Sequence, residues 1–213
     1  MEKEIIVLAK SSKHGEFCIA GIDTETGEWI RPISNNLAHE GSVPLEDITY
    51  EDGSELQILD KVKIQFISHS PTISQPENFK YDPGYYWVKT GSATIEDVVR
   101  MRGYDNVEKV FYNTGKDVLE REINGGPSLL LLRVDNPYIF IKTFESQKVQ
   151  LNFEYNNCNY SYFKISDPQV KQYYANQCDG CHDHREYLNV VFSLTDKHIE
   201  SGKYYKMVAQ IFD

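Results

Sequence analysis

Short apolar runs separated by polar turns dominate the chain, and most of them have the length and composition of β-strands. In the first half the runs are residues 5–8, 17–22, 29–33 and 62–67. The last of these alternates apolar and polar residues over its first half, as in a strand with one buried face. Asp23-Thr-Glu-Thr-Gly27 supplies polar turn residues and a glycine, which predicts a hairpin loop. Residues 107–112 are a further strand candidate, and residues 35–57 predict a long loop.

The second half continues the strand pattern and adds a helix. Its strand-like runs are residues 128–134, 138–144, 149–155, 160–165, 187–194 and 204–212. Asp167 followed by Pro168 predicts a helix start, because aspartate caps a helix and proline suits its first position. In the first half, Thr94 and Asp97 predict a capped helix that ends at Gly103. Strands, then one helix, then two more strands is the order that an OB-type barrel requires.

The predicted fold class is mainly β with minor α, as two OB-like small β-barrels packed together, each with a short helix. The first half shows the same element order in a looser form, with longer insertions. Asn124-Gly-Gly-Pro127 is the strongest break in the chain. We therefore place the first barrel, with its long loop insertions, at residues 1–125 and the second barrel at residues 126–213.

Charge and cysteine content limit the choice of partner and compartment. The formal net charge is −10, which counts against wrapping of nucleic acid, where neutralised phosphates supply most of the affinity. A local basic groove on an acidic body stays compatible with this charge. The acidic start Met1-Glu-Lys-Glu4 does not resemble a secretory signal, and the 4 cysteines are few for a secreted scaffold. We expect a cytoplasmic protein with no membrane partner.

Segments from opposite ends of the chain point to one family. Near the start, Lys10-Ser-Ser-Lys13-His-Gly15 precedes Gly27-Glu-Trp29-Ile-Arg31-Pro32, and near the end Asp167-Pro168 precedes an apolar finish at residues 202–212. These motifs, with residues 56–61, 75–78 and 86–87, resemble the prokaryotic dual OB-domain family over most of the chain. The resemblance implies two OB barrels and a nucleic-acid-binding or adaptor module attached to bacterial or phage conflict systems. It supplies no catalytic residues to carry over.

The first candidate binding surface consists of Lys10, Lys13, His14, Trp29 and Arg31. OB-type barrels bind single strands with a positive groove and aromatic platforms on which bases stack. Trp29 and Arg31 are two residues apart on one predicted strand, so they project from the same face. The alternative is that Trp29 belongs to the core and that Arg31 pairs with a nearby acid.

A second polar and aromatic cluster contains Gln75, Asn78, Tyr86 and Trp87. Its amide side chains can read base edges, or they can satisfy buried backbone groups. Its aromatic rings can stack on a ligand, or they can hold a long loop against the barrel. We favour packing for the rings and keep Gln75, Asn78 and Trp87 as nucleic-acid-binding candidates.

Cys178-Asp-Gly-Cys181-His182-Asp-His184 is the motif closest to metal chemistry. Two cysteines at this spacing form a zinc knuckle, and His184 can add a third ligand. A structural zinc site normally draws on a second pair elsewhere, and Cys158 is the only obvious candidate. The string also matches the Cys-x-x-Cys-His of covalent haem attachment, which requires export. A polar loop is the simpler interpretation, so we predict no metal and no cofactor.

No nucleophile elbow, phosphate loop or paired carboxylates suggest catalysis, and no small-molecule substrate is evident. The sequence therefore predicts a non-catalytic module that binds single-stranded or structured nucleic acid. The alternative is a protein–protein adaptor or assembly subunit that does not bind nucleic acid. A small metalloprotein centred on Cys178 and Cys181 is a third, weaker hypothesis.

Overall fold

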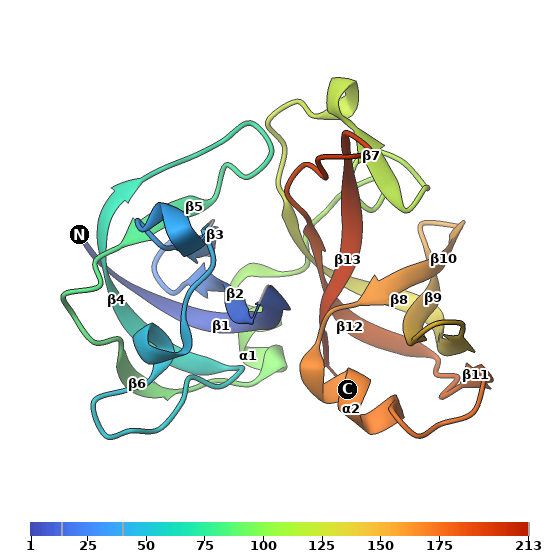
Figure 1. The fold of residues 1–213 in the computed structure, drawn as a ribbon, viewed down its shortest axis with the longest axis horizontal. Coiled ribbons are helices and arrows are strands. Elements are labelled where there is room, and N and C mark those ends of the chain that lie inside the picture. Colours follow the sequence, from blue (N-terminus) through green and yellow to red (C-terminus); the bar gives the residue numbers. More distant parts are fainter. Residues whose placement is uncertain (14, 40, 213) are drawn as a thin grey trace. The chain divides into compact units, whose positions relative to one another are not determined.

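The computed structural model describes residues 1–13, 15–39 and 41–212, and the chain divides into two compact units, Met1–Gly103 and Tyr104–Asp213. Each unit contains a closed five-stranded β-barrel (Figure 1). The prediction of a mainly β fold with two OB-like barrels is therefore confirmed. Within the described ranges, no helix has the length and hydropathy needed to cross a membrane.

The first barrel joins five strands in the order β1-β2-β3-β5-β4 and closes by antiparallel pairing of β1 with β4. Its strands are β1 Glu2–Lys13, β2 Glu16–Asp23, β3 Trp29–Ile33, β4 Asp60–His69 and β5 Asn78–Tyr81. β3 and β5 run parallel, and the outer strand β6 Val88–Ser92 pairs with β4. Two short 3₁₀ turns, Leu37–His39 and Leu45–Ile48, replace the usual helix between the third and fourth strands.

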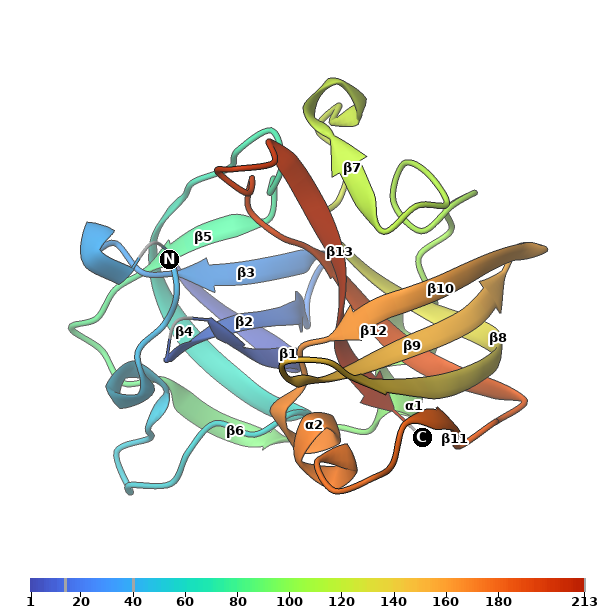
Figure 2. The same cartoon turned by 45° about the vertical axis from the view of Figure 1, so that its right-hand side comes forward.

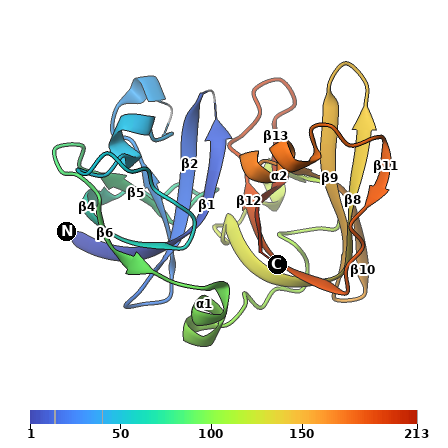
Figure 3. The same cartoon turned by 90° about the horizontal axis from the view of Figure 1, so that it is seen from below.

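The second barrel repeats this topology and keeps the helix in its usual place. Its strands are β8 Leu129–Thr143, β9 Gln147–Tyr155, β10 Cys158–Ile165, β12 Tyr187–Leu194 and β13 Lys203–Phe212. They join in the order β10-β9-β8-β12-β13, and parallel pairing of β10 with β13 closes the barrel. Helix α2 Pro168–Tyr174 stands between β10 and β12. The short strand β11 Gly180–His182 pairs with the distal part of β8 (Figure 3).

The two helices begin where their caps predict. The Thr94 hydroxyl accepts from the Asp97 amide at 3.2 Å and the Asp97 carboxylate accepts from the Thr94 amide at 3.0 Å, which completes a capping box for α1 Ile95–Arg102. Gly103 ends α1 with a φ of 75°, a conformation that favours glycine. The Asp167 carboxylate accepts from the amides of Gln169 and Val170 at the start of α2.

Each barrel has its own apolar core. The first core consists of Ile5, Val7, Ile19, Ile30, Val43, Ile48, Tyr50, Leu56, Val62, Ile64, Phe66, Tyr81 and Trp87. The second core also includes residues from the segment that precedes its barrel, namely Val110, Phe111, Val118 and Ile123. That segment adds strand β7 Asp117–Leu119, which pairs with β13, and the 3₁₀ turn Glu120–Glu122.

The division of the chain differs from the expected boundary at residue 125. Residues 104–125 belong to the second unit because their side chains enter its core and β7 joins its last strand. Residues 107–112 also differ from their predicted strand, since they run as irregular chain and turn. The ammonium of Lys206 on β13 fixes this turn by donating to the Val110 carbonyl at 2.7 Å.

Candidate nucleic-acid interface

Trp29 and Arg31, the centre of the first predicted surface, lie in the interior. Each is 9% exposed. The Arg31 guanidinium donates to the Glu77 carboxylate at 3.2 Å, and the Arg102 guanidinium lies 5.6 Å from the centroid of the Trp29 ring. The alternative in which Trp29 packs and Arg31 pairs with an acid is the one that the structure supports, so neither side chain forms a binding surface.

Lys10 is also used within the first barrel. Its ammonium donates to the Leu56 carbonyl at 2.9 Å and lies 4.9 Å from the centroid of the Phe17 ring. Lys13 is the last residue of β1, opposite Glu16, and His14 lies outside the described residues. The Lys10 ammonium, expected at the binding surface, therefore makes contacts within the first barrel.

The second predicted cluster is buried as well. Gln75, Asn78 and Trp87 are 7%, 4% and 2% exposed. The Asn78 amide donates to the Gln75 carbonyl oxygen at 3.1 Å, and Trp87 packs edge-on against Tyr81 with ring centroids 5.7 Å apart. These residues pin the chain around β5 to the barrel, so they too belong to packing rather than to a surface.

A different set of aromatic and basic side chains lies wholly or partly exposed on β8, β9 and β10 of the second barrel and on the loop between β8 and β9. Figure 2 shows these three strands side by side. We call this set the aromatic–lysine face; it consists of Tyr138, Phe140, Lys142, Phe144, Lys148, Tyr162 and Lys164. It occupies the first three strands of the barrel and the loop between the first two. This is the region through which OB barrels bind oligonucleotides.

Strand register places the side chains of the face in rows. Phe140 pairs with Gln150, which pairs with Lys164, so these three residues cross the three strands on one line. Lys142 pairs with Lys148 in the neighbouring row. Paired residues point to the same side of a sheet, so the rings and ammonium groups share one surface.

A β-bulge turns Tyr162 outward on this face. The register of β9 and β10 shifts between Tyr160 and Phe163, and Tyr162 has a φ of 63°. Its amide donates to the Asn152 side chain at 3.0 Å, and its carbonyl accepts from the Gln150 side chain at 3.0 Å. The bulge thus re-aims one side chain, and polar contacts from β9 hold it in place.

Tyr162 and Phe144 are exposed, Tyr138 and Phe140 are half-buried, and ring contacts order several of them. Phe140 meets Tyr162 edge-on with centroids 5.2 Å apart, and Tyr138 stacks on His184 at 4.9 Å. Phe144, at the loop between β8 and β9, is 69% exposed. The ammonium groups of Lys142 and Lys148 lie 5.8 Å and 5.2 Å from its centroid. A base that stacks on Phe144 would bring its phosphate close to two cations.

The electrostatics of the face are locally positive. Among the described residues, Lys148 and Lys164 have no ion-pair partner, whereas Lys142 lies 3.3 Å from Asp179. Burial lowers the pKa of Lys171 on α2, and the nearby charge of Lys164 lowers it further. Lys164 therefore adds positive charge close to Lys171, which the Asp167 carboxylate partly offsets.

The residues of the cysteine loop make other contacts in the structure. Cys178 and Cys181 are exposed free thiols. The His182 ring lies 2.8 Å from the Cys178 carbonyl, and His184 is stacked on Tyr138. No group of three or more potential metal ligands occurs in the described part of the chain. Cys181 instead pairs with Phe140 across β11 and β8, at the edge of the aromatic–lysine face.

One pattern in the sequence indicates the aromatic–lysine face. In Tyr138-Ile-Phe140-Ile-Lys142-Thr-Phe144, aliphatic Ile139 and Ile141 alternate with aromatic and basic residues. The two isoleucines are buried in the second core, so the alternating residues point outward. An aromatic or a lysine at each outward position of a strand is therefore the pattern that predicts such a face.

Two closed five-stranded barrels in one chain define a tandem OB-fold protein. The chain belongs to the family described as the dual OB-containing domain, which matches residues 3–211. No curated protein matches the sequence.

Among solved structures, one likeness is to "Structure of murine DNA binding protein bound with ds DNA", with a TM-score of 0.36, 9% identity, and coverage of 100% of this chain and 96% of that one. A second is to "Molecular basis for abrogation of activation of pro-inflammatory cytokines", with a TM-score of 0.33, 12% identity, and coverage of 100% and 91%. Both TM-scores are too low for these likenesses to bear on function.

Proposed function

We propose that the protein is a non-catalytic nucleic-acid-binding module that binds unpaired bases on the aromatic–lysine face of its second barrel. The observation that carries this proposal is the contact of half-buried Phe140 with exposed Tyr162, flanked by exposed Phe144 and by lysines without ion-pair partners among the described residues. OB barrels combine base stacking on aromatic rings with phosphate contacts to a positive groove. Membership of the dual OB-containing domain family supports the fold on which this argument depends.

Single-stranded ligands suit the face better than duplexes. The rings of Phe140, Phe144 and Tyr162 can stack only on bases whose faces are open, and a duplex hides those faces within its own stack. The overall charge of −10 limits the number of phosphate contacts. With about three contacts, from Lys142, Lys148 and Lys164, the logarithm of affinity would fall with the logarithm of salt concentration with a slope of about −2.

Fluorescence anisotropy of labelled single-stranded DNA and RNA tests the proposal. Phe140→Ala and Tyr162→Ala should each weaken binding about 5- to 150-fold, as expected when a stacking contact worth about 1–3 kcal/mol is lost. Lys148→Glu should weaken binding and reduce its salt dependence. Lys63→Glu is the matched control, because Lys63 is an exposed lysine on β4 of the first barrel, with 46% of its side chain accessible.

Two results would contradict the proposal. One is the absence of binding at low salt, where electrostatic attraction is strongest. The other is binding that the Phe140, Tyr162 and Lys148 variants leave unchanged. The first result would favour the protein-adaptor alternative, and co-purifying proteins would then identify the partner.

A further inference from the structure

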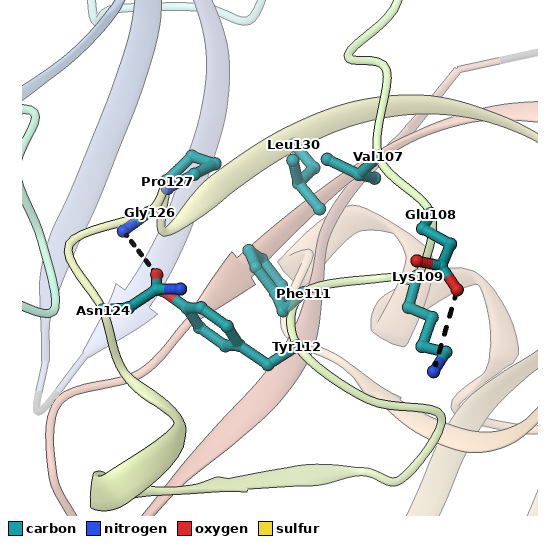
Figure 4. Close-up of a pocket in the computed structure, with 9 residues that line it drawn as sticks. All are labelled: Val107, Glu108, Lys109, Phe111, Tyr112, Asn124, Gly126, Pro127 and Leu130. Atoms are coloured by element: carbon teal, nitrogen blue, oxygen red, sulfur yellow. Dashed lines mark hydrogen bonds and ion pairs between the residues drawn. The ribbon is translucent and has the colours of Figure 1, made fainter.

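Two exposed thiols in the second unit, those of Cys178 and Cys181, take no part in the contacts on which the proposed function depends. Neither cysteine lines the pocket shown in Figure 4. The apolar walls of that pocket are themselves covered, since Phe111 is 7% exposed and Leu130 is 0% exposed. The pocket therefore presents no open ring to a ligand, whereas both cysteine side chains are open to solvent.

The chain between the two cysteines bends back on itself. The His182 ring lies 2.8 Å from the Cys178 carbonyl. In an extended chain, Cα atoms four residues apart are separated by about 13 Å, which is too far for this contact. The bend lies at Asp179, and the following Gly180 has a φ of 140°, in the range that favours glycine. The two cysteines are thus the first and fourth residues of a bent segment.

A bent segment of four residues has the length that a disulfide needs. In a β-turn the first and fourth Cα atoms lie less than about 7 Å apart, and a disulfide joins Cα atoms about 4.4–6.8 Å apart. A type II turn has glycine in third place with a φ of about +80°. Gly180 stands in third place, so a rotation of about 60° there completes the turn. The space beside Gly180 is open, because a Cβ at this position would meet nothing within 4 Å.

Asp179 lies inside the ring that such a disulfide would close, and it connects the loop to the aromatic–lysine face. Its carboxylate accepts from the Thr143 amide at 2.9 Å and lies 3.3 Å from the Lys142 ammonium. Strand β11, which begins at Gly180, is fixed by its pairing with β8. A rotation at Gly180 therefore moves the residues before it, so the Asp179 carboxylate is drawn away from both of its partners.

We propose that Cys178 and Cys181 form a reversible disulfide by exchange with a small-molecule disulfide. The closed ring separates Asp179 from Lys142 and leaves the Lys142 ammonium to contact phosphate. The effect on oligonucleotide binding rests on the proposed function, whereas formation of the disulfide does not.

The exchange takes place in two steps. One cysteine thiolate attacks the small disulfide, forms a mixed disulfide and releases one thiolate. The second cysteine thiolate attacks the mixed disulfide, closes the ring and releases the other thiolate. Two protein thiols are oxidised, one small disulfide is reduced to two thiols, and the two cysteine protons pass to the released sulfur atoms.

Equilibration of the full chain with excess oxidised glutathione tests the bond. The intact mass should fall by about 2 Da, the mass of the two hydrogens lost, and peptide mapping should place the bond between Cys178 and Cys181. Cys178→Ser and Cys181→Ser should each stop at the mixed disulfide with glutathione. Cys158→Ser is the matched control, since Cys158 is a half-buried free cysteine, and it should form the bond as the unaltered chain does. Unmodified thiols, or mixed disulfides alone, in the unaltered chain would overturn the proposal.

Hydrogen exchange reports on the ring without any ligand. The Thr143 amide should exchange faster in the disulfide form than in the reduced form, because its hydrogen bond to the Asp179 carboxylate is lost. An unchanged exchange rate would overturn the coupling of the loop to the aromatic–lysine face. This measurement does not depend on oligonucleotide binding, so it tests the inference even where the proposed function fails.

Fluorescence anisotropy of labelled single-stranded DNA measures the consequence for binding. The disulfide form should bind up to about fivefold more tightly than the reduced form, the gain expected when an exposed ion pair no longer neutralises a lysine. Asp179→Asn should give the same gain in the reduced chain and should remove the difference between the two forms. Asp52→Asn is the matched control, because Asp52 is an exposed aspartate that also accepts from a backbone amide, that of Ser54 at 2.9 Å. Equal affinities of the two forms, with binding present in both, would overturn the coupling.

Discussion

The two barrels share one strand order but differ in the outward positions of their first two strands. In the first barrel the residues that alternate with core residues Ile5, Val7 and Ile19 are aliphatic and buried: Ile6, Leu8, Ala20 and Ile22. On β8 of the second barrel the residues that alternate with buried Ile139 and Ile141 are Tyr138, Phe140 and Lys142, which are partly or fully exposed. The strand order is the same in both barrels, and the exposure and type of the alternating side chains decide which barrel suits nucleic acid.

Charge follows the same division. Unit Met1–Gly103 has 10 lysines and arginines against 17 aspartates and glutamates, a formal charge of −7. Unit Tyr104–Asp213 has 12 against 15, a formal charge of −3. In the more acidic unit, the Arg31 guanidinium is also held in a buried ion pair with Glu77. Phosphate contacts are therefore easier to build on the second barrel.

The largest expected effect separates the structural role of Arg31 from binding. Replacing Arg31 with alanine removes an ion-pair partner of the Glu77 carboxylate, and Glu77 is a buried residue, 7% exposed. Breaking a buried pair in this way costs about 3–5 kcal/mol. Arg31→Ala should therefore destabilise the first barrel by that amount in urea unfolding. Its oligonucleotide affinity, measured under conditions where the chain stays folded, should not change.

A double variant controls for the charge left behind. Arg31→Met combined with Glu77→Leu removes both charges and should recover most of the lost stability, because replacing a buried pair by apolar residues is often neutral. If this double variant regains stability but loses oligonucleotide affinity, Arg31 takes part in binding.

Local patterns predicted most of the barrel strands and both helix caps, but they missed the short strands β5, β6, β7 and β11 and placed a strand wrongly at residues 107–112. Thr94 and Asp97 define the start of α1 by contacts three residues apart, and the hairpin loop that includes Gly27 lies within one short segment. The domain boundary could not be predicted in this way. The Asn124-Gly-Gly-Pro127 break marks only a loop, whereas contacts from β13 on the far side of the barrel hold residues 104–125 in the second unit.

The residues expected at the binding site are of suitable chemical types, but they are buried. Trp29 and Arg31 are the residue types that bind single strands, but the burial of Arg31 depends on Glu77, which is 46 positions away. No spacing rule connects the two. The outward residues of β8 could have been found from their period-two alternation, because the buried partners in that strand are all aliphatic.

The pH dependence of the free energy of unfolding above neutrality tests the comparison of the two barrels, and its expected effect is of intermediate size. The hydroxyls of Tyr50 and Tyr81 in the first barrel donate to Asp60 and Asp47, and burial together with these carboxylates raises the pKa of both tyrosines above their usual value. The native state then holds these protons more tightly than the unfolded state. Their stabilisation is complete below pH 10 and is lost as the pH rises further, when the unfolded tyrosines ionise.

The second unit also has tyrosines with a raised pKa, because burial raises the pKa of Tyr138 and Tyr160 as well as that of Tyr174, and it has one group with the opposite effect. Tyr174 donates to Asp183, and its pKa is raised by burial and by that carboxylate. Lys206, with its pKa lowered by burial to about 8, stabilises the fold increasingly as the pH rises from there toward the ordinary lysine value of 10.5. Lys206 therefore offsets part of the alkaline loss of stability that the tyrosines of the second unit cause.

Urea unfolding at pH 8.5, pH 10 and pH 11 measures these contributions. Tyr81→Phe should lose less stability between pH 8.5 and pH 11 than the unaltered chain, because one of the ionising groups has been removed. Lys206→Met should lose more between pH 8.5 and pH 10, because the compensating group is absent. Identical losses in all three proteins would rule out these groups as the source of the pH dependence.

The smallest expected effect concerns the cysteine loop beside the aromatic–lysine face. His184 stacks on Tyr138 and the His182 ring contacts the Cys178 carbonyl, so neither imidazole is placed to complete a site with the two thiols. Replacing Cys178 and Cys181 together with serine should change stability by no more than about 0.5 kcal/mol, as for other exposed positions. Metal analysis by plasma mass spectrometry should find no zinc above background in the unaltered chain. A contrary result would be stoichiometric zinc in the unaltered chain that the double substitution removes, together with a lower melting temperature. The loop would then be a structural metal site, and the pairing of Cys181 with Phe140 would connect that site to the aromatic–lysine face.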